Sequence, residues 1–472
     1  FRNVTGVQTC ALPIWFMFAT PLLSNGGTTR GLPISCFLNY MDDSREGINE
    51  HYKETSWLSS LGGGVGGYIG VRGPEGTSKG SASSGGIPFV CVLDRYMLAF
   101  SQGKTRRGSY AAYLDISHPE IDEFLQIRKP SGGDANRKAL NLHHAVNLTD
   151  EFMMACLNDA DWNLVSPKTG EVKKTVSARA LMRKIVETRH QTGEPFILFS
   201  DTANRALPEP LKRKGLKINH SNLCTEIMLP TAPDRTAVCC LSSVNVAAHD
   251  EWKDDPLFIE DLMRMLDNCL EDFIRRAPPE LWRAVNSAKA ERSVGLGAMG
   301  LQTFFQDRMI AWDSDLARAY NVMIFESLAK KTTAASLKLG AERGEAPDME
   351  GTGHRFAHRM AVAPNASSSI FVPAGPISPS IEQFPENIFI HKTLSGSHKV
   401  RNPALERLLE AKGKNTDKVW KDILANDGSV QHLSFLSDDE KKVFLTAFET
   451  DQRATIQLNN DRTPHVDQGI SL

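Results

Sequence analysis

The chain has 472 residues, of which 41% are hydrophobic and 23% charged, and 54 Lys and Arg against 56 Asp and Glu leave a formal net charge of −2. This balance argues against the broad basic surface that binds DNA or RNA, and no apolar run is long enough to cross a membrane. Eight cysteines without a secretory signal favour reduced thiols in a cytoplasmic protein, in which a disulfide is more often catalytic than structural.

The first residues differ in character from the rest of the chain. Residues 1–14 follow neither a helical nor a strand period and resemble translated sequencing-adapter sequence. We therefore expect them to be non-native or disordered, and exclude Cys10 from any chemistry; a genuine irregular arm is the alternative. Residues 15–472 contain no repeat, low-complexity linker or charge block, which predicts one continuous α/β unit.

Two glycine-rich stretches imitate nucleotide-binding motifs. Residues 62–67 have the glycine spacing of a dinucleotide fingerprint, but residues 68–74 cannot form the helix that must follow it. Residues 103–105 imitate the end of a P-loop whose first glycine is missing. Both motifs are rejected. The stretches are either loops that contact phosphates through backbone N–H groups and Arg106, or solvated surface loops.

The middle of the chain alternates helices with short buried strands. Ser177 is predicted to cap a helix that stops at Gly193, before a strand at residues 195–199. A long helix is predicted from about residue 316 to residue 339, ending at Gly340. This alternation indicates a mainly parallel sheet or barrel.

One pentapeptide collects three reactive side-chain types. Asn222, Cys224 and Glu226 place an amide, a thiol and a carboxylate at alternating positions, which an extended backbone would project from the same side. Because cysteine is often buried for packing and Asn or Glu is usually solvated, the pattern alone favours a structural role. Motifs elsewhere in the chain change this interpretation.

After residue 14, the sequence resembles the large subunit of class I ribonucleotide reductases, with the motifs in family order. The matching motifs are residues 19–24 (ATPLLS), Ser35-Cys36, residues 221–226 (SNLCTE), residues 239–245 (CCLSSVN) and residues 364–368 (PNASS). The stretches SQGKTRRGS, LDISHPEIDEFL, NLHHAVN, RSVGLGAMGLQ and HKTLSGS are similar to the bacterial aerobic branch.

The resemblance implies radical chemistry at the pentapeptide. Cys224 would become a thiyl radical and abstract the 3′ hydrogen of a ribose, Glu226 would act as general base on the 3′ hydroxyl, and Asn222 would hold the sugar. Cys36 and Cys239 would supply two electrons and finish as a disulfide, so their Cα atoms should lie within roughly 7 Å. The neighbouring Cys240 is assigned to packing.

Two nucleotide-contacting regions are also implied. The substrate diphosphate would be held by Thr20, Ser24 and the run Pro364, Asn365, Ala366, Ser367 and Ser368, at the start of a helix. Many family members have Thr where this chain has Asn365. A deoxynucleotide effector would be bound by Asp43, Arg72 and Arg106, with ATP, dATP, dTTP and dGTP as the expected effectors; a solvated turn is the alternative for Asp43.

The family fold implied here is an α/β barrel of ten strands, made of two five-stranded parallel halves around a finger loop that carries the radical cysteine. We expect the last strand and tail, and an N-terminal ATP cone, to be cut away. In the family the tail carries the tyrosines that relay the radical from the small subunit and the cysteines that reduce Cys36–Cys239, so this chain should be unable to turn over repeatedly by itself. Expected partners are a ribonucleoside diphosphate, a metal-containing small subunit that supplies the radical, thioredoxin or glutaredoxin, and a second copy in a homodimer. No metal or cofactor is predicted in this subunit.

The predicted function is therefore reduction of ribonucleotides to 2′-deoxyribonucleotides for DNA precursor synthesis. Two alternatives remain. An adenosylcobalamin-dependent reductase would share the barrel but need no small subunit, whereas its central motif usually carries Pro and Gly around the cysteine. A non-catalytic nucleotide-binding scaffold would keep the loops without the chemistry, and the intact cysteines argue against it.

Overall fold

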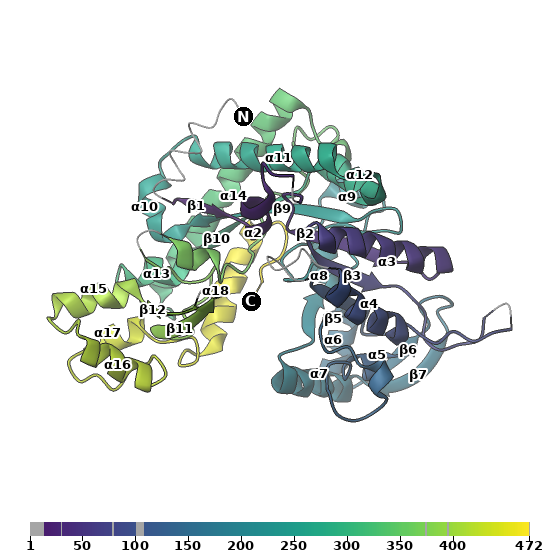
Figure 1. Ribbon diagram of the computed structural model, residues 1–472, viewed down its shortest axis with the longest axis horizontal. Helices are drawn as coiled ribbons and strands as arrows, with labels where there is room; N and C mark the ends of the chain where they lie inside the picture. Colours follow the sequence, from purple (N-terminus) through teal and green to yellow (C-terminus); the bar gives the residue numbers. More distant parts are fainter. Residues whose placement is uncertain are drawn as a thin grey trace.

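A curled, mixed sheet of eight strands runs through the molecule, with helices packed around it (Figure 1). The computed structural model describes residues 14–29, 31–77, 80–100, 108–372, 375–393 and 396–471. Cys10 and Arg106, with most of the segment 1–14 and of the loop 101–109, lie outside the described residues. Within the described ranges, no helix is both long and apolar enough to span a membrane.

Five parallel strands form one half of the sheet, in the order β2, β3, β4, β5 and β8. Their bounds are Cys36–Met41, Gly64–Ile69, Tyr110–Asp115, His143–Leu148 and Phe196–Phe199. Nearly every residue of the first four strands is buried, because helices cover a parallel sheet and its strands become continuous runs of apolar or small residues. This is one of the two five-stranded parallel halves that the sequence predicts.

The connections in this half carry helices and one hairpin. They are α3 (Arg45–Ser60), α4 (Ile87–Ala99), α5 (Ile121–Phe124), α6 (Asp150–Leu157), α7 (Ala178–Thr192), α8 (Ser200–Ala206), α9 (Glu209–Arg213), β6 (Asp161–Val165) and β7 (Val172–Ser177). The prediction for α7 is confirmed: Ser177 accepts a hydrogen bond from the Ala180 N–H, and the helix ends at Gly193 with a φ of 78°.

Strand β9 joins the two halves of the sheet. The strands involved are β9 (Ala237–Asn245), β10 (Val294–Met299) and β1 (Phe16–Phe18). β9 runs antiparallel to β2 and β1, and parallel to β10. Parallel bridges from Leu296 to Met360 and from Val362 to Ile470 extend this half beyond β10. The stretch around residue 361 therefore lies in the barrel wall.

The second half is covered by helices of 4 to 29 residues. They are α2 (Thr20–Asn25), α10 (His249–Trp252), α11 (Phe258–Arg276), α12 (Trp282–Glu291), α13 (Leu301–Gln306), α14 (Asp315–Arg343) and α18 (Gln452–Arg462). Short 3₁₀ helices occupy Ala135–Arg137, Val246–Ala248, Pro279–Leu281, Pro347–Met349, Ser368–Phe371 and Thr463–His465.

The predicted end of α14 at Gly340 is wrong. The helix continues to Arg343 and ends before Gly344. Gly340 is helical and serves packing instead, since a Cβ atom there would lie 2.0 Å from the carbonyl oxygen of Gly353. A glycine near a helix end can thus mark a close backbone approach rather than the end itself.

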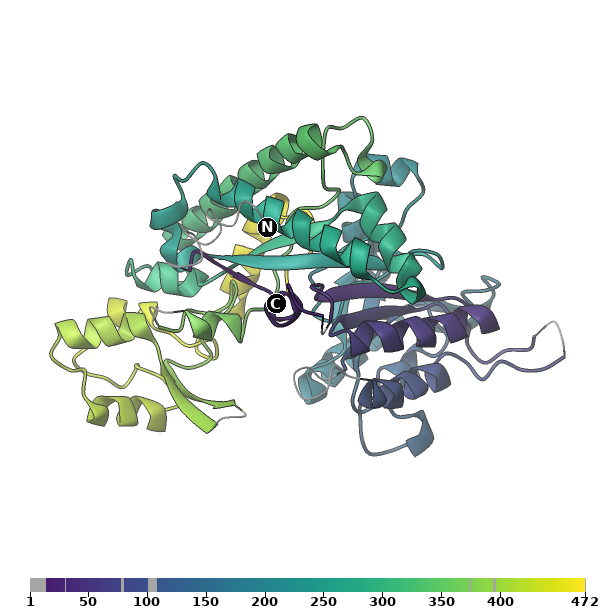
Figure 2. The same cartoon turned by 45° about the horizontal axis from the view of Figure 1, so that its top comes forward.

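A small subdomain with its own core projects from the barrel (Figures 1 and 2). It contains β11 (Ile388–Thr393), β12 (Gly396–Arg401), α15 (Pro403–Ala411), α16 (Asp417–Ala425) and α17 (Asp438–Val443). Trp420, Leu405 and Phe444 are buried in this core. Asn402 fastens it to the barrel by donating a hydrogen bond to the Gln306 side chain. This separate core was not predicted from the sequence.

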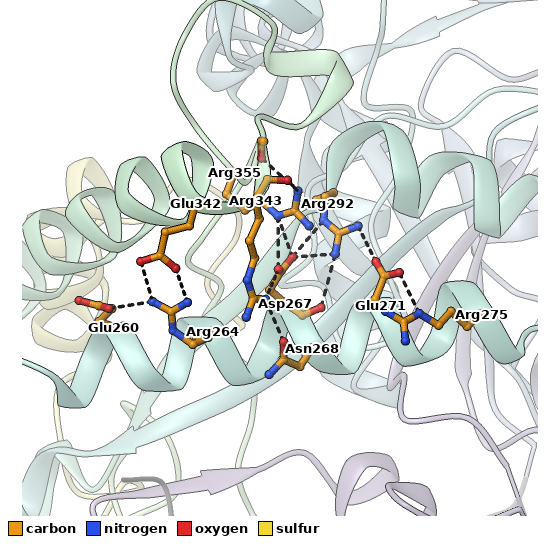
Figure 3. A network of polar contacts seen from close by, with 11 residues as sticks. Glu260, Arg264, Asp267, Asn268, Glu271, Arg275, Arg292, Glu342, Arg343 and Arg355 are labelled. Atoms are coloured by element: carbon orange, nitrogen blue, oxygen red, sulfur yellow. Dashed lines mark hydrogen bonds and ion pairs between the residues drawn. The ribbon is translucent and has the colours of Figure 1, made fainter. Parts of the chain in front are cut away.

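A buried carboxylate ties α11 to the elements around it (Figure 3). Asp267 on α11 is almost fully buried and accepts hydrogen bonds from Arg292, Arg343 and Arg355. These arginines come from the end of α12, the end of α14 and the segment that follows α14. Burial opposes ionisation of Asp267, but the surrounding guanidinium groups outweigh it and hold its pKa below the usual value.

Asp267→Asn should destabilise the fold by about 3–5 kcal/mol, the cost of leaving buried charges without their partner. Asp272→Asn, on the same helix, is the matched control, because the Asp272–Arg276 pair is largely exposed and such pairs contribute no more than about 1 kcal/mol. Urea unfolding of both variants measures the difference. Equal midpoints for Asp267→Asn and Asp272→Asn would contradict the structural role of the cluster.

Candidate functional site

Two cysteines that are far apart in sequence face each other across the junction of the two half-barrels. Cys36 opens β2 and pairs directly with Cys239 of the antiparallel strand β9. Directly opposed residues of an antiparallel pair have Cα atoms about 4.5–5.5 Å apart, which is within disulfide range. Both cysteines are buried free thiols. The predicted proximity of Cys36 and Cys239 is confirmed.

A long loop between α9 and β9 carries Cys224 over strand β3. A Cβ atom on Gly66 of β3 would lie 2.2 Å from the carbonyl oxygen of Ser221 and 2.7 Å from the Cα of Asn222, so only glycine lets the loop approach this strand. The Tyr113 hydroxyl of β4 donates a hydrogen bond to the Asn222 carbonyl at 2.6 Å. The loop is therefore fixed against the inner wall of the parallel half.

The loop is not extended, so the predicted same-side projection of its alternating side chains is wrong. The backbone turns after Asn222, and Thr225 has a φ of 70°. The Asn222 side-chain oxygen accepts a hydrogen bond from the Ile227 N–H at 3.0 Å and closes the turn. Asn222 and Glu226 are thus brought together by a side-chain-capped turn rather than by strand periodicity.

Asn222 and Glu226 meet at the sulfur of Cys36. The Asn222 amide nitrogen lies 3.1 Å from this sulfur, and a carboxylate oxygen of Glu226 accepts the thiol at 3.8 Å. Cys224 is half-buried, and its charge contributes to raising the pKa values of Cys36 and Tyr113. The structure therefore gathers Cys36, Cys239, Asn222, Cys224 and Glu226 at one place.

Glu226 has the properties of a proton acceptor. Burial raises its pKa to about 7, although hydrogen bonds from the loop backbone, Asn222 and Cys36 oppose the shift. Its second carboxylate oxygen has no hydrogen-bond partner among the described residues. A carboxyl group that titrates near neutral pH and has one oxygen without a hydrogen-bond partner is suited to general base catalysis.

The thiols of the pair are held in the neutral form. Burial raises the pKa of Cys36 well above its usual value, and Glu226, Cys224 and Cys239 raise it further. Cys240, the next residue on β9, is buried in the main core, where a hydrogen bond with Cys269 and then burial raise its pKa. This position agrees with the packing role expected for Cys240.

The predicted phosphate-binding run lies beside β9. The Asn365 side chain donates hydrogen bonds to the Ser243 hydroxyl at 3.0 Å and to the Ala363 carbonyl at 2.9 Å. The Ser368 hydroxyl donates to Asn365, and a 3₁₀ helix starts at Ser368. Asn365 is therefore used to hold the loop, while Ser367, Pro364 and Ala366 are exposed.

The N-terminal part of the predicted phosphate cradle lies next to the same strand. Thr20 is exposed at the start of α2, after Ala19 donates its N–H to the Leu241 carbonyl of β9. Ser24 lies one turn later. Ala19 and Ala363 both pack against the apolar cluster that contains Cys36 and Cys239. Both halves of the cradle thus border the cysteine pair.

Two of the three predicted effector-binding residues meet. Asp43 follows β2 and Arg72 follows β3, so both lie at the carboxyl ends of neighbouring parallel strands. The Arg72 guanidinium donates to the Asp43 carboxylate at 2.7 Å, and its backbone N–H lies 3.4 Å from the same carboxylate.

Gln468 is a further residue at the site that the sequence did not indicate. Its side-chain oxygen accepts the Met228 N–H at 3.3 Å, and its amide donates to the Val294 carbonyl at 3.0 Å. No motif or spacing connects this residue with the cysteines, so only the tertiary structure places it there.

We also looked for a cavity and for a metal-binding group away from the cysteines. A cavity of about 530 Å³ opens between the end of β9 and the small subdomain, lined by residues that include Asn245, Thr303 and Arg407. In the part of the chain that the structure describes, no group of three or more His, Cys, Asp or Glu side chains could hold a metal ion.

The comparisons with known proteins agree with the geometry. The family model of the ribonucleotide reductase barrel domain matches residues 34–354 and 346–472. The putative ribonucleoside-diphosphate reductase large subunit of Frog virus 3 is 50% identical over 97% of this chain and 80% of its own length. The large subunit of Invertebrate iridescent virus 3 is 42% identical, with the same coverage.

A solved structure extends the similarity to a bacterial protein. The class Id ribonucleotide reductase alpha subunit of Actinobacillus ureae has a TM-score of 0.85 and 36% identity, covering 97% of this chain and 80% of that one. The predicted α/β barrel and class I large-subunit resemblance are confirmed. The chain belongs to the ribonucleotide reductase family, in which it is a large (alpha) subunit built on the family's barrel domain.

Proposed function

We propose that this chain reduces ribonucleoside diphosphates to 2′-deoxyribonucleoside diphosphates, with Cys224 as the radical residue and Cys36 with Cys239 as the reductant. The observation that carries the proposal is the direct pairing of Cys36 with Cys239 beneath a loop that brings Asn222 and Glu226 onto the Cys36 sulfur. A two-electron reductant, an amide and a base therefore share one site.

The chemistry begins at an unactivated C–H bond, which an acid or a simple nucleophile cannot break. A metal-containing small subunit supplies the oxidising equivalent that makes Cys224 a thiyl radical. Cys224 then takes the 3′ hydrogen atom of the ribose, and Glu226 accepts the 3′ hydroxyl proton through its unpaired carboxylate oxygen. Asn222 holds the sugar hydroxyls.

The reducing electrons come from the cysteine pair. One thiol protonates the 2′ hydroxyl, which leaves as water. Two electrons pass from Cys36 and Cys239 to the sugar, the proton of the second thiol ends on C2′, and a disulfide forms between the two sulfurs. At the end of the turnover Cys224 returns the hydrogen atom to C3′ and becomes a thiyl radical again, and Glu226 returns the proton to the 3′ oxygen. Cysteines of the C-terminal tail, which thioredoxin or glutaredoxin keeps reduced, then reduce the disulfide.

The substrate diphosphate is placed on the exposed polar surface beside β9. Thr20 and Ser367 are exposed, and Ser24, Ser368 and Asn365 lie in the same two segments. Hydroxyl groups and backbone N–H groups at the start of a helix suit an anionic ligand. The proximity of both segments to the cysteine cluster supports a ribose located over Cys36.

Effector binding and dimerisation are assigned to the neighbouring surface. Asp43 and Arg72, with Arg106 from the loop 101–109, form the proposed deoxynucleotide site. Helix α3 leaves Trp57 exposed, and α4 with the residue that follows it leaves Val92, Leu98 and Phe100 exposed. A second copy of the chain covering this surface would remove an exposed apolar patch from water and place the effector site at the dimer interface.

The function is tested with the protein extended to the length of its relatives, since this chain spans 80% of them. We expect deoxynucleotide formation from CDP that requires a class I small subunit, a dithiol and no cobalamin. Activity with adenosylcobalamin alone would instead identify the cobalamin-dependent class. Binding of CDP without any reduction, in the presence of an active small subunit, would identify a non-catalytic scaffold.

A further inference from the structure

A strap formed by residues 466–470 crosses the loop that carries Cys224. The Gly469 N–H donates a hydrogen bond to the Glu226 carbonyl at 2.8 Å. A Cβ atom on Gly469 would lie 2.9 Å from that oxygen and 3.0 Å from the Thr225 carbonyl oxygen. The strap is therefore in close backbone contact with the turn that holds Glu226.

The strap is itself firmly attached to the barrel wall. The Asp467 carboxylate accepts the backbone N–H groups of Arg359 and Met360 at 3.1 and 2.8 Å. The Gln468 N–H donates to the Met360 carbonyl, and the Gly469 carbonyl accepts the Val362 N–H. With its backbone fixed on both sides, the strap holds the Gln468 side chain in one position.

The Gln468 side chain lies between the loop and the strand next to the cysteine pair. Its oxygen accepts the Met228 N–H of the loop, while its amide nitrogen donates to the Val294 carbonyl at the start of β10. The next residue on β10 is Gly295, where a Cβ atom would lie 3.1 Å from the Cys239 sulfur. The amide nitrogen of Gln468 is thus directed to the immediate surroundings of this sulfur.

The contact between the Gln468 amide and Cys239 affects the ionisation of the Cys239 thiol. Burial and the negative charge of Glu226 raise the pKa of Cys239 well above its usual value, and a hydrogen bond from the Gln468 side chain acts in the opposite direction. A thiolate at Cys239 would otherwise be formed in an apolar and negatively charged environment. Gln468 is a neutral donor beside the sulfur, and it is not one of the groups assigned to the sugar chemistry.

We propose that Gln468 is a positioning residue for thiol–disulfide exchange, whose amide N–H stabilises Cys239 as the leaving thiolate when an external dithiol reduces the Cys36–Cys239 disulfide. This inference rests on the proposed function, because it requires that disulfide. Cys36 is 6% exposed and Cys239 is fully buried, so the dithiol attacks the Cys36 sulfur.

The electrons and atoms of the exchange balance. A thiolate of the dithiol forms a bond to the Cys36 sulfur, the S–S bond breaks, and its electron pair goes to Cys239. The second thiol of the dithiol attacks the mixed disulfide and releases Cys36. The dithiol leaves as a disulfide, and its two protons remain on Cys36 and Cys239.

The test uses this chain with its Cys36–Cys239 disulfide formed by oxidised dithiothreitol. Reduction by dithiothreitol at pH 8 is followed by differential alkylation and mass spectrometry of the peptides that contain Cys36 and Cys239. Gln468→Met keeps the length of the side chain but removes the donor. Gln468→Glu keeps an acceptor for the Met228 N–H and adds a negative charge. Gln431→Met is the matched control, because Gln431 donates to a backbone carbonyl in the small subdomain.

We expect Gln468→Met to slow reduction about threefold to tenfold, since a leaving thiol of higher pKa leaves more slowly, and Gln468→Glu to slow it further. The control should match the parent chain. A purely structural role gives the reverse order, with Gln468→Glu the milder change. Parent-like rates for both Gln468 variants, or a slower rate for Gln468→Met than for Gln468→Glu, would overturn this inference but not the proposed function. Failure of the Cys36–Cys239 disulfide to form in the parent chain would overturn both. Thermal unfolding midpoints show whether each variant is folded. If Gln468→Met does not fold, the reduction rate of Gln468→Glu decides the test.

Discussion

Replacing Cys224 with Ser should abolish nucleotide reduction and leave nucleotide binding close to that of the parent protein. An alcohol O–H bond is much harder to convert into a radical than a thiol S–H bond, so serine cannot take over the hydrogen abstraction. The substitution is small, and contacts of Asn222, Tyr113 and Gly66 hold the loop around Cys224. Product formation and CDP binding, measured in the extended protein with its small subunit, separate the two effects.

Cys156→Ser is the control for this experiment. Cys156 is a partly buried thiol on α6 whose sulfur donates to the Ala178 carbonyl, far in sequence from the loop. Its replacement should leave the rate of reduction within about twofold of the parent protein, because surface and partly buried polar changes away from the site have small effects. Turnover by Cys224→Ser at a rate similar to that of Cys156→Ser would exclude a radical at Cys224.

Glu226→Gln should lower the rate of reduction by about 10²- to 10⁴-fold, the range that general base catalysis contributes, with a smaller effect on substrate binding. The amide keeps the shape of the carboxyl group but cannot accept the 3′ hydroxyl proton. Single-turnover rates at saturating CDP measure the chemical step. A change confined to substrate affinity would assign Glu226 to positioning instead.

The pH dependence gives a second signature of Glu226. Its pKa is raised to about 7, so the deprotonated base is lost as the pH falls through 7, and the rate of reduction should fall with it. A carboxyl pKa that is higher in the folded than in the unfolded state also means that stability decreases as the pH rises from about 4.5 to 7. Glu226→Gln should therefore lose the acidic limb of the rate profile and unfold at no lower temperature than the parent chain at pH 8.

The fold could be predicted where local rules act alone. Ser177 and Gly193 bound α7 as expected, because a cap and a left-handed glycine are decided within one turn of helix. Gly340 was misread as a helix end, since the residue that requires it to be glycine, Gly353, lies on a separate segment. The subdomain that contains Trp420 was missed for a different reason. Its helices α15 and α16 have apolar residues at helical spacing, but this spacing does not show that the two helices pack against each other rather than against the barrel.

The identity of the site residues could be predicted better than their arrangement in space. Resemblance to the family brought Cys36, Cys239, Asn222 and Glu226 together, and the register of β2 with β9 explains how the two cysteines meet. The alternation of the pentapeptide suggested an extended strand, yet the side chain of Asn222 bonds to the backbone of the loop and turns it. Competition between side-chain and backbone hydrogen bonds of this kind is decided by tertiary context.

The most direct test of the account is the location of the disulfide after one turnover. The extended protein, with the cysteines of its C-terminal tail replaced by serine, is fully reduced and freed of dithiol, mixed with its small subunit and CDP, quenched with an alkylating agent and digested for mass spectrometry. We predict about one deoxynucleotide per active site, with Cys36 and Cys239 joined by a disulfide and Cys240 alkylated, and no such disulfide when CDP is omitted. The account would be contradicted if product formed while Cys36 and Cys239 both stayed reduced and were therefore alkylated at the quench. A substrate-dependent disulfide that involves Cys240 or Cys269 instead would also contradict it.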